Sequence, residues 1–344
     1  MLPVLLASLF LSIFSFFNLF GIKRELLPNF LVYAAIGFAL FFLAKKIGVS
    51  FFLSNIKFFY WLFIFLLLIT YVVGVEARGS KRWIDFYFFN FQPSEFFKIF
   101  FVLFFADYFT RHKKDIEDVA VFWKSLGYFI LPVFIIFKQP DLGTALVFTF
   151  TFFCIFIFSK VPKRYLLYVF FMILTISPVG WLILKEYQRQ RIISFLNPEL
   201  NPQGTAYNMV QAVITIGSGQ FFGRGMGYGT QSRLLFLPEN HTDFAFASLI
   251  EQFGLFGGLA IFVAYLIVAV VLIKRLFFYQ KSRDEENNFR FLLTLGFLSY
   301  FVFQIIVNIS MNLGLLPIVG IALPFISYGG SSLVSLLFAL GLLF

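Results

Sequence analysis

The feature of this sequence that most constrains its fold is a series of long apolar runs separated by short polar stretches. Runs of about 17–25 apolar residues cross the hydrocarbon core of a membrane as helices. A soluble domain could not bury a chain that is 60% hydrophobic and only 13% charged. The approximate ranges of the ten predicted membrane helices are 2–20, 27–44, 56–74, 93–110, 119–137, 142–159, 164–184, 243–273, 289–312 and 327–344. The predicted fold class is an all-α polytopic membrane protein with a single domain over residues 1–344.

The distribution of Lys and Arg among the loops predicts the orientation of these helices. With the N-terminus inside, four inner loops carry fourteen of these residues and three short outer loops carry six. Because cytoplasmic loops are enriched in Lys and Arg, both termini are predicted to be cytoplasmic. The large loop at 185–242, between the seventh and eighth helices, then lies outside. The first run lacks a basic segment and a small-residue cleavage site, so we expect a retained helix rather than a signal peptide.

The formal net charge of +10 limits the classes of partner. In a soluble protein this excess would suggest nucleic acid, but here the cations lie in loops and no aromatic-basic motif interrupts the apolar runs, so no nucleic acid is expected. The charge indicates contact with anionic headgroups or with an anionic substrate. The single cysteine, Cys154, excludes an intrachain disulfide and a cysteine metal cluster.

The densest polar group is PENHTD at 238–243, where the outer loop enters the eighth helix. Asp243 places a carboxylate at the mouth of a membrane helix beside a basic loop, which makes it the first candidate for catalysis. The alternative is that Thr242 or Asp243 only caps the helix. His241 is a candidate base, although a lone histidine more often has a structural role. Glu251, about two turns into the helix, needs a polar partner.

Several reaction classes are excluded by missing motifs. The sequence has no zinc-ligand spacing such as HExxH and no GxSxG turn for a nucleophilic serine. Neither a zinc hydrolase nor a serine hydrolase of this type is therefore predicted. The glycine-rich GRGMGYG at 223–229 follows no strand and lacks GK[ST], which argues against a nucleotide loop and for tight turns. Residues 206–217 form a short helical pattern, predicted to lie along the membrane interface.

Ionisable residues also lie near three other helix ends. Glu95 and Lys98 share a helix face near membrane depth, where an unpaired charge costs at least about 2.5–3.5 kcal/mol. They form either an ion pair that locks packing or one wall of a polar cavity. Asp141 is suited to cap the sixth helix. Arg189 and Arg191 either bind phosphate oxygens through their guanidinium groups or lie at the membrane interface.

The stretch at 312–332 is too apolar for a solvated loop, and its prolines and glycines prevent a straight helix. Irregular backbone at membrane depth is tolerated only where it is buried in protein or lines a cavity. We therefore expect a re-entrant segment beside the polar site.

Four stretches together resemble the SEDS family of proteins (shape, elongation, division, sporulation). They are RGSKRW at 78–83 with QPSE at 92–95, QPDLGT at 139–144, FLPENHTDF at 236–244, and 320–332 with its core PFISYGG. The resemblance covers essentially the whole chain and its ten helices. GTQS ahead of FLPE is more similar to the elongation branch of the family than to the division branch. Ala245 and Gln252 are small departures that leave the polar group intact.

The resemblance implies a peptidoglycan glycosyltransferase that polymerises lipid II at the outer face of the bacterial cytoplasmic membrane during cell elongation. It also implies a class B penicillin-binding protein as the transpeptidase partner, together with other membrane proteins of the elongation complex. The family's proposed catalytic aspartate corresponds to Asp243.

The implied chemistry is attack of a sugar 4-hydroxyl on the anomeric carbon of a lipid-pyrophosphate sugar, with inversion. Asp243 would act as general base, and cations would stabilise the leaving pyrophosphate. A divalent cation, Mg²⁺ or Mn²⁺, bridging Asp243 and pyrophosphate fits this chemistry, but no ligand cluster demands one and no metal site is predicted. The predicted substrate-binding residues are Lys81, Arg82, Glu95, Lys98, Arg189, Arg191, Arg233, Glu239, His241 and Ser327.

Two other classes of function fit a charged cavity in a membrane. A lipid II flippase needs polar groups along its whole translocation path, whereas the polar motifs here concentrate on the outer side. A non-catalytic scaffold for cell-wall enzymes is the third class. The position of the polar motifs favours the polymerase.

Overall fold

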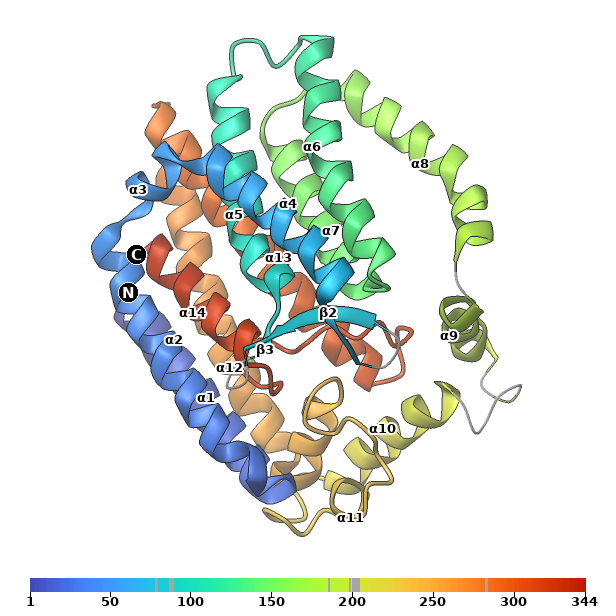
Figure 1. Ribbon diagram of the computed structural model, residues 1–344. Helices are drawn as coiled ribbons and strands as arrows, with labels where there is room; N and C mark the ends of the chain where they lie inside the picture. Colours follow the sequence, from blue (N-terminus) through green and yellow to red (C-terminus); the bar gives the residue numbers. More distant parts are fainter. Residues whose placement is uncertain (78–79, 87–89, 185, 198, 200–204, 282–283) are drawn as a thin grey trace.

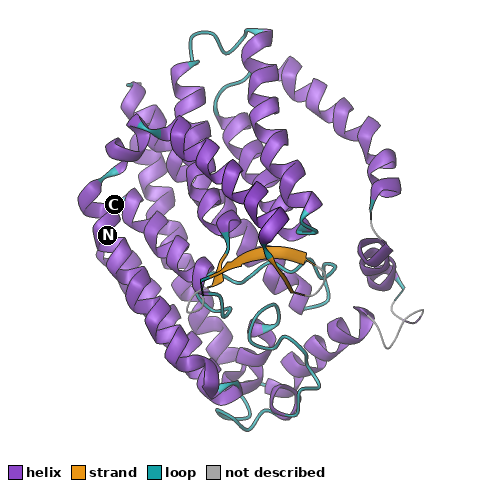
Figure 2. Ribbon diagram, in the orientation of Figure 1, coloured by secondary structure: helices purple, strands orange, loops and turns teal. Residues whose placement is uncertain are grey.

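The computed structural model describes residues 1–77, 80–86, 90–184, 186–197, 199, 205–281 and 284–344, and it consists of helices with one small sheet (Figures 1 and 2). Among these residues, six helices are long and apolar enough to cross a membrane, and two shorter apolar helices accompany them. The predicted all-α polytopic fold class is confirmed.

A helix occupies each of the ten predicted ranges. These helices are α1 (Leu2–Ile22), α2 (Leu27–Ile47), α4 (Ile56–Val73), α5 (Pro93–Arg111), α6 (Val119–Lys138), α7 (Leu142–Phe158), α8 (Lys163–Ile183), α12 (Ala245–Gln280), α13 (Glu285–Asn312) and α14 (Gly330–Leu343). Proline stands in the first turn of α1, α2 and α5, where its missing N–H would have had no intrahelical partner. Most helix ends lie within a few residues of the prediction.

The structure adds short elements between these helices. They are η1 (Arg24–Leu26), α3 (Val49–Ser54), α9 (Glu186–Leu196), α10 (Thr205–Gly219) and α11 (Thr230–Arg233). The helical pattern predicted at 206–217 corresponds to α10, which packs against α12. The stretch before α5, predicted as a loop, contains the antiparallel strands β1 (Val75–Ala77), β2 (Ser80–Asp85) and β3 (Asn90–Phe91), in that order. These strands are too short to produce a clear period-two pattern.

Helices α5 and α13 lie at the centre of the bundle (Figure 1). Helix α13 packs against α5, α7 and α12, while α14 packs against α2 and α1 against α12. Aromatic rings fill the helix contacts: Tyr60 of α4 stacks on Phe104 of α5 with ring centroids 4.2 Å apart, and Phe129 of α6 stacks on Phe152 of α7 at 4.3 Å. Large apolar side chains are exposed on α1, α2 and α12, as lipid-facing surfaces require.

Helix α12 differs from the single helix predicted at 243–273. It begins at Ala245, extends to Gln280 and is interrupted at Gly254, whose φ of 68° and ψ of −169° are not helical. Backbone groups freed by this break pair with the glycine-rich loop: Leu255 N–H donates to the Gln220 carbonyl at 2.9 Å, and Arg224 N–H donates to the Glu251 carbonyl at 2.8 Å. The sequence pattern missed the break because the apolar run continues through it.

The segment between α13 and α14 is irregular, as predicted for 312–332, although α14 begins at Gly330 rather than at 327. Several of its apolar side chains are buried, among them Ile321, Leu323 and Phe325. This segment therefore packs into the protein, and residues 319–322 line the cavity described next.

Candidate active site

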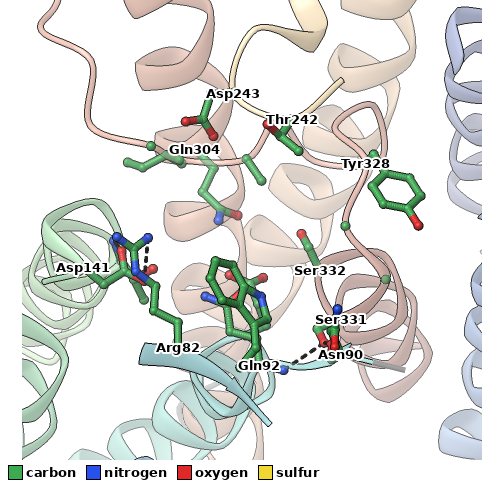
Figure 3. A pocket seen from close by; sticks show the side chains of 18 of the residues that line it. Arg82, Asn90, Gln92, Asp141, Thr242, Asp243, Gln304, Tyr328, Ser331 and Ser332 are labelled. Carbon is green, nitrogen blue, oxygen red and sulfur yellow. Dashed lines mark hydrogen bonds and ion pairs between the residues drawn. The ribbon is translucent and has the colours of Figure 1, made fainter. Parts of the chain in front are cut away.

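A polar cavity of about 370 Å³ lies where the sheet, the ends of several helices and the irregular segment meet (Figure 3). A larger cavity of about 770 Å³, between α1 and α12, has an apolar lining and offers no groups for acid–base or ionic chemistry. The polar and charged residues of the smaller cavity are Tyr33, Arg82, Trp83, Asn90, Gln92, Glu95, Asp141, Thr144, Arg191, His241, Thr242, Asp243, Gln304, Tyr328, Ser331 and Ser332. This lining makes the smaller cavity the candidate active site.

Asp243 lies on the wall of this cavity, two residues before α12. The carboxamides of Asn308 and Asn312, both buried on α13, each donate a hydrogen bond of 3.1 Å to its backbone carbonyl. The Asn312 side chain also accepts a 3.1 Å bond from the backbone N–H of Ala247 in the first turn of α12. Two turns of α13 thus hold the Asp243 backbone in place.

Thr242 and Asp243 both stand before the N-cap position of α12. The N-cap residue is Phe244, and this helix has no side-chain cap hydrogen bond. The Thr242 hydroxyl instead donates at 2.8 Å to the carboxylate of Glu239, which itself sits at a turn with a φ of 56°. The N-cap position of α12 therefore belongs to Phe244 and not to Thr242 or Asp243.

The irregular segment before α14 clamps the other side of the same loop. Tyr328 N–H donates to the His241 carbonyl at 2.8 Å, and the Ser327 hydroxyl donates to the Thr242 carbonyl at 2.6 Å. Ser327 Oγ also accepts from Leu323 N–H at 2.8 Å. Ser327 therefore shapes the loop, and it is not among the residues that line the cavity.

Arg82 and Asp141 form a pair on another wall (Figure 3). The Arg82 guanidinium donates to the Pro140 carbonyl at 2.7 Å and lies 3.6 Å from the Asp141 carboxylate. The Asp141 carboxylate also accepts a 3.1 Å bond from Thr144 N–H, so it caps α7 as the sequence predicted. Asp141 is buried, so its cap and its ion pair together hold the guanidinium at the cavity.

Glu95 and Lys98 form a buried ion pair with an N–O distance of 2.8 Å, in the first turns of α5. Glu95 lines the cavity, whereas Lys98 lies behind it, with its Nζ 5.8 Å from the centre of the Tyr300 ring. The pair is therefore both a packing ion pair and part of the cavity wall. The Glu95 carboxylate forms the wall, and the Lys98 ammonium neutralises that carboxylate from within the bundle.

The remaining predicted cations are dispersed. Arg191 of α9 lines the cavity and donates to the Ile318 carbonyl at 3.3 Å. Arg189 instead donates to the Leu182 carbonyl at the end of α8 at 2.6 Å. Of the described residues, Lys81 and Arg233 do not line this cavity. The structure thus brings together Asp243, Arg82, Glu95, Arg191 and His241, and it places Lys81, Lys98, Arg189, Arg233, Glu239 and Ser327 outside the lining.

The uncharged polar residues of the site were not predicted from the sequence. Ser331 accepts a hydrogen bond from Gln92 N–H at 3.0 Å and donates to the Asn90 carbonyl at 2.8 Å, which joins the start of α14 to the junction of β3 and α5. On α13, amides recur every fourth residue at Gln304, Asn308 and Asn312. That spacing within an apolar helix was a usable signal, because it places three polar side chains on one face.

Carboxylates enter the cavity from three elements, at Glu95, Asp141 and Asp243. Among the residues that the structure describes, no group of three or more His, Cys, Asp or Glu side chains is arranged to hold a metal ion.

The sequence matches a known family over nearly its full length. A sequence model of the FtsW/RodA/SpoVE family, described as cell cycle proteins, matches residues 2–344. The peptidoglycan glycosyltransferase MrdB of Helicobacter pylori is 35% identical over 99% of this chain and 86% of the relative. The probable peptidoglycan glycosyltransferase FtsW of Acinetobacter baylyi is 36% identical over 85% of this chain and 72% of the relative.

Solved structures share the fold. A chain from a peptidoglycan synthase complex that coordinates polymerization and crosslinking has a TM-score of 0.81 and 27% identity, with 100% of this chain and 96% of that chain covered. The rod shape determining protein RodA of Thermus thermophilus has a TM-score of 0.71 at 24% identity, with 99% and 94% covered. The predicted family is confirmed: the chain belongs to the FtsW/RodA/SpoVE family of cell cycle proteins, the SEDS family.

Proposed function

We propose that this peptidoglycan glycosyltransferase polymerises lipid II into glycan strands at the outer face of the bacterial cytoplasmic membrane, with Asp243 as general base. The observation that carries the proposal is a single cavity in which the Asp243 carboxylate shares the lining with the cations Arg82 and Arg191. The reaction needs both kinds of group, one for the proton and one for the pyrophosphate. Glycosyltransferase activity agrees with the names of the relatives.

In the proposed reaction, the oxygen of a sugar 4-hydroxyl attacks the anomeric carbon of a lipid-pyrophosphate sugar. The bond from that carbon to the pyrophosphate oxygen breaks with inversion, and the pyrophosphate leaves with the electron pair. Asp243 takes the hydroxyl proton, a contribution that is typically worth about 10²–10⁴-fold in rate. The bonds from Asn308 and Asn312 to its backbone carbonyl hold the main chain that carries the carboxylate.

Arg82 and Arg191 bind the pyrophosphate in this proposal. Guanidinium groups contact phosphate oxygens through two parallel N–H donors. Arg82 suits this role because Pro140 and Asp141 already hold its side chain, so little freedom is lost when the substrate binds. Asp243 is the residue that would hold a divalent cation, Mg²⁺ or Mn²⁺, and such an ion would supply charge stabilisation for the leaving group.

We further propose that the enzyme belongs to the elongation branch and works with a class B penicillin-binding protein, which supplies the transpeptidase. Other membrane proteins of the elongation complex would join them. The similarity to a chain of a synthase complex that couples polymerization to crosslinking supports this assembly. We expect the two proteins to purify together and the complex to polymerise faster; equal rates would argue against activation.

The proposal is tested with the purified complex and lipid II in detergent, by separating the glycan products on a gel. Polymer that depends on this chain supports the glycosyltransferase. Movement of lipid II between the leaflets of vesicles without polymer formation would instead support the flippase.

A further inference from the structure

The three amides on one face of α13 differ in their partners. Asn308 donates to the carbonyls of Asp243 at 3.1 Å and Ile321 at 2.7 Å, and Asn312 donates to the same Asp243 carbonyl at 3.1 Å. These two side chains are therefore used in holding backbone. Gln304, one turn earlier in the helix, is not.

Gln304 is buried, with 3% of its surface exposed, and its Oε1 has no hydrogen-bond partner among the described protein atoms. It lines the polar cavity together with Asp243 and Arg82. Figure 3 shows its carboxamide directed into the space that these residues border. A buried acceptor without a partner costs about 1–3 kcal/mol. An apolar residue would serve packing better at this position, so packing does not account for Gln304.

We infer that Gln304 is a substrate-contact residue, whose Oε1 accepts a hydrogen bond from the saccharide and holds the sugar beside Asp243. The inference rests on the proposed glycosyltransferase function and adds a recognition role to the same cavity. The choice of the saccharide follows from hydrogen-bond chemistry. An amide oxygen only accepts, and ionised pyrophosphate oxygens also only accept. The substrate donors nearest the reacting anomeric carbon are the sugar hydroxyls and the acetamido N–H, and these are the groups that would lie beside Asp243.

The two walls of the cavity then bind chemically different parts of the substrate. The guanidinium groups of Arg82 and Arg191 suit the anionic part of the substrate, and the neutral carboxamide of Gln304 suits the uncharged ring. A site built to hydrogen-bond a substrate group discriminates strongly against an analogue that lacks the group, because its own polar atom is then left unpaired. Gln304 should therefore contribute to selectivity as well as to rate.

The test compares wild type with Gln304→Met, which keeps the side-chain length and removes the acceptor, in the complex with its partner and with lipid II. We expect kcat/KM to fall about 10–100-fold, with a thermal midpoint equal to or above that of wild type. The matched control is Gln231→Met. Gln231 Oε1 is also buried without a partner among the described atoms, but it lies outside the cavity lining. The control should keep wild-type kcat/KM.

A second variant and a set of analogues complete the test. Gln304→Glu keeps an acceptor oxygen and should retain more activity than Gln304→Met; an equal loss would overturn the inference. Analogues of lipid II that each lack one sugar donor are compared next. Wild type should discriminate against one of them, and Gln304→Met should lose that discrimination.

The possible results distinguish a failure of the Gln304 contact from a failure of the proposed glycosyltransferase function. Wild-type kcat/KM in Gln304→Met, or loss of activity only together with a lowered thermal midpoint, overturns the contact role alone. Absence of polymer from wild type overturns the proposed function and the inference together.

Discussion

The carboxamide of Asn312 donates a hydrogen bond of 3.1 Å to the backbone carbonyl of Asp243. Asn312 is the last residue of α13 and is fully buried, while Asp243 lies just before α12. The same carboxamide accepts from Ala247 N–H at 3.1 Å, which satisfies one of the N–H groups left unpaired at the start of α12. One side chain thus bonds both to the start of α12 and to the backbone of the proposed general base.

Replacing Asn312 by Leu should lower kcat about 10–100-fold, because a displacement of about 1 Å at a reacting group has an effect of that size. It should also lower the thermal midpoint, since the Ala247 N–H loses its partner. KM should change little if Asn312 acts only by positioning. Asn55→Leu is the control, because Asn55 is exposed and its side chain bonds only to groups of α3. An unchanged kcat in a folded Asn312→Leu protein would contradict the positioning role.

Replacing Asp243 by Asn keeps the size of the side chain and removes its ability to accept a proton. Polymer formation should fall by about two orders of magnitude or more. The thermal midpoint should stay the same, because Asn keeps the size of the side chain and a hydrogen-bonding oxygen. Asp243→Glu should retain little activity or none.

The same substitution at the N-cap residue of α6, Asp118→Asn, is the control for Asp243→Asn. Asp118 accepts a 2.9 Å bond from Ala120 N–H at the start of α6, and it does not line the cavity. Asp118→Asn should therefore keep normal activity. Near-normal polymer from a folded Asp243→Asn protein would move the proposed base to Glu95, whose carboxylate also lines the cavity.

The Glu95–Lys98 pair is expected to affect stability and activity separately. Lys98→Met leaves the Glu95 carboxylate buried without its cation and should lower the free energy of unfolding by about 3–5 kcal/mol. The double variant Glu95→Gln, Lys98→Met removes both charges, so stability should largely return. Activity should stay low, because Glu95 belongs to the cavity wall.

The exposed pair of Arg290 and Glu286 on α13 provides the comparison, with an N–O distance of 2.7 Å. Arg290→Met should change the unfolding free energy by about 1 kcal/mol or less. Thermal midpoints and polymer yield are measured for all variants. Recovery of activity in the double variant would show that the Glu95–Lys98 pair serves packing alone.

Gly254→Ala should destabilise the break in α12. Gly254 has a positive φ, which costs a residue with a side chain about 1–2 kcal/mol, and an added Cβ would lie 2.3 Å from the Phe221 carbonyl oxygen. Gly127→Ala in α6 is the control, since an added Cβ meets nothing within 4 Å there. The thermal midpoint should fall for Gly254→Ala and be unchanged or raised for Gly127→Ala. A neutral Gly254→Ala would show that the α12 segment relaxes readily.

The orientation of the chain is tested by labelling cysteines in intact cells. In a background without Cys154, a cysteine in place of the exposed Tyr228 should react with an impermeant reagent, and one in place of Lys281 should not. The expectation follows from the excess of Lys and Arg in the inner loops. The reverse pattern would place the cavity on the cytoplasmic side. It would then contradict the proposal that lipid II is polymerised at the outer face.

The helices and the first candidate for catalysis could be predicted from the sequence alone. Apolar runs long enough to span a membrane leave the backbone one local solution, so α1, α2 and α4 could be located without knowledge of their neighbours. The irregular segment before α14 was also predictable, because proline and glycine act locally. Asp243 was distinguished by its position at a helix entrance beside basic residues.

Only the tertiary structure decided which side chains share the cavity. Arg82 reaches it because β2 forms and Pro140 and Asp141 meet the guanidinium, whereas Lys81, its neighbour in sequence, lies outside the lining. Gln304 and Asn312 could not be assigned roles from their amide type, which is neutral and common in structural positions. Their roles depend on partners far apart in the chain, since a hydrogen bond depends on distance and direction in space and not on separation in sequence.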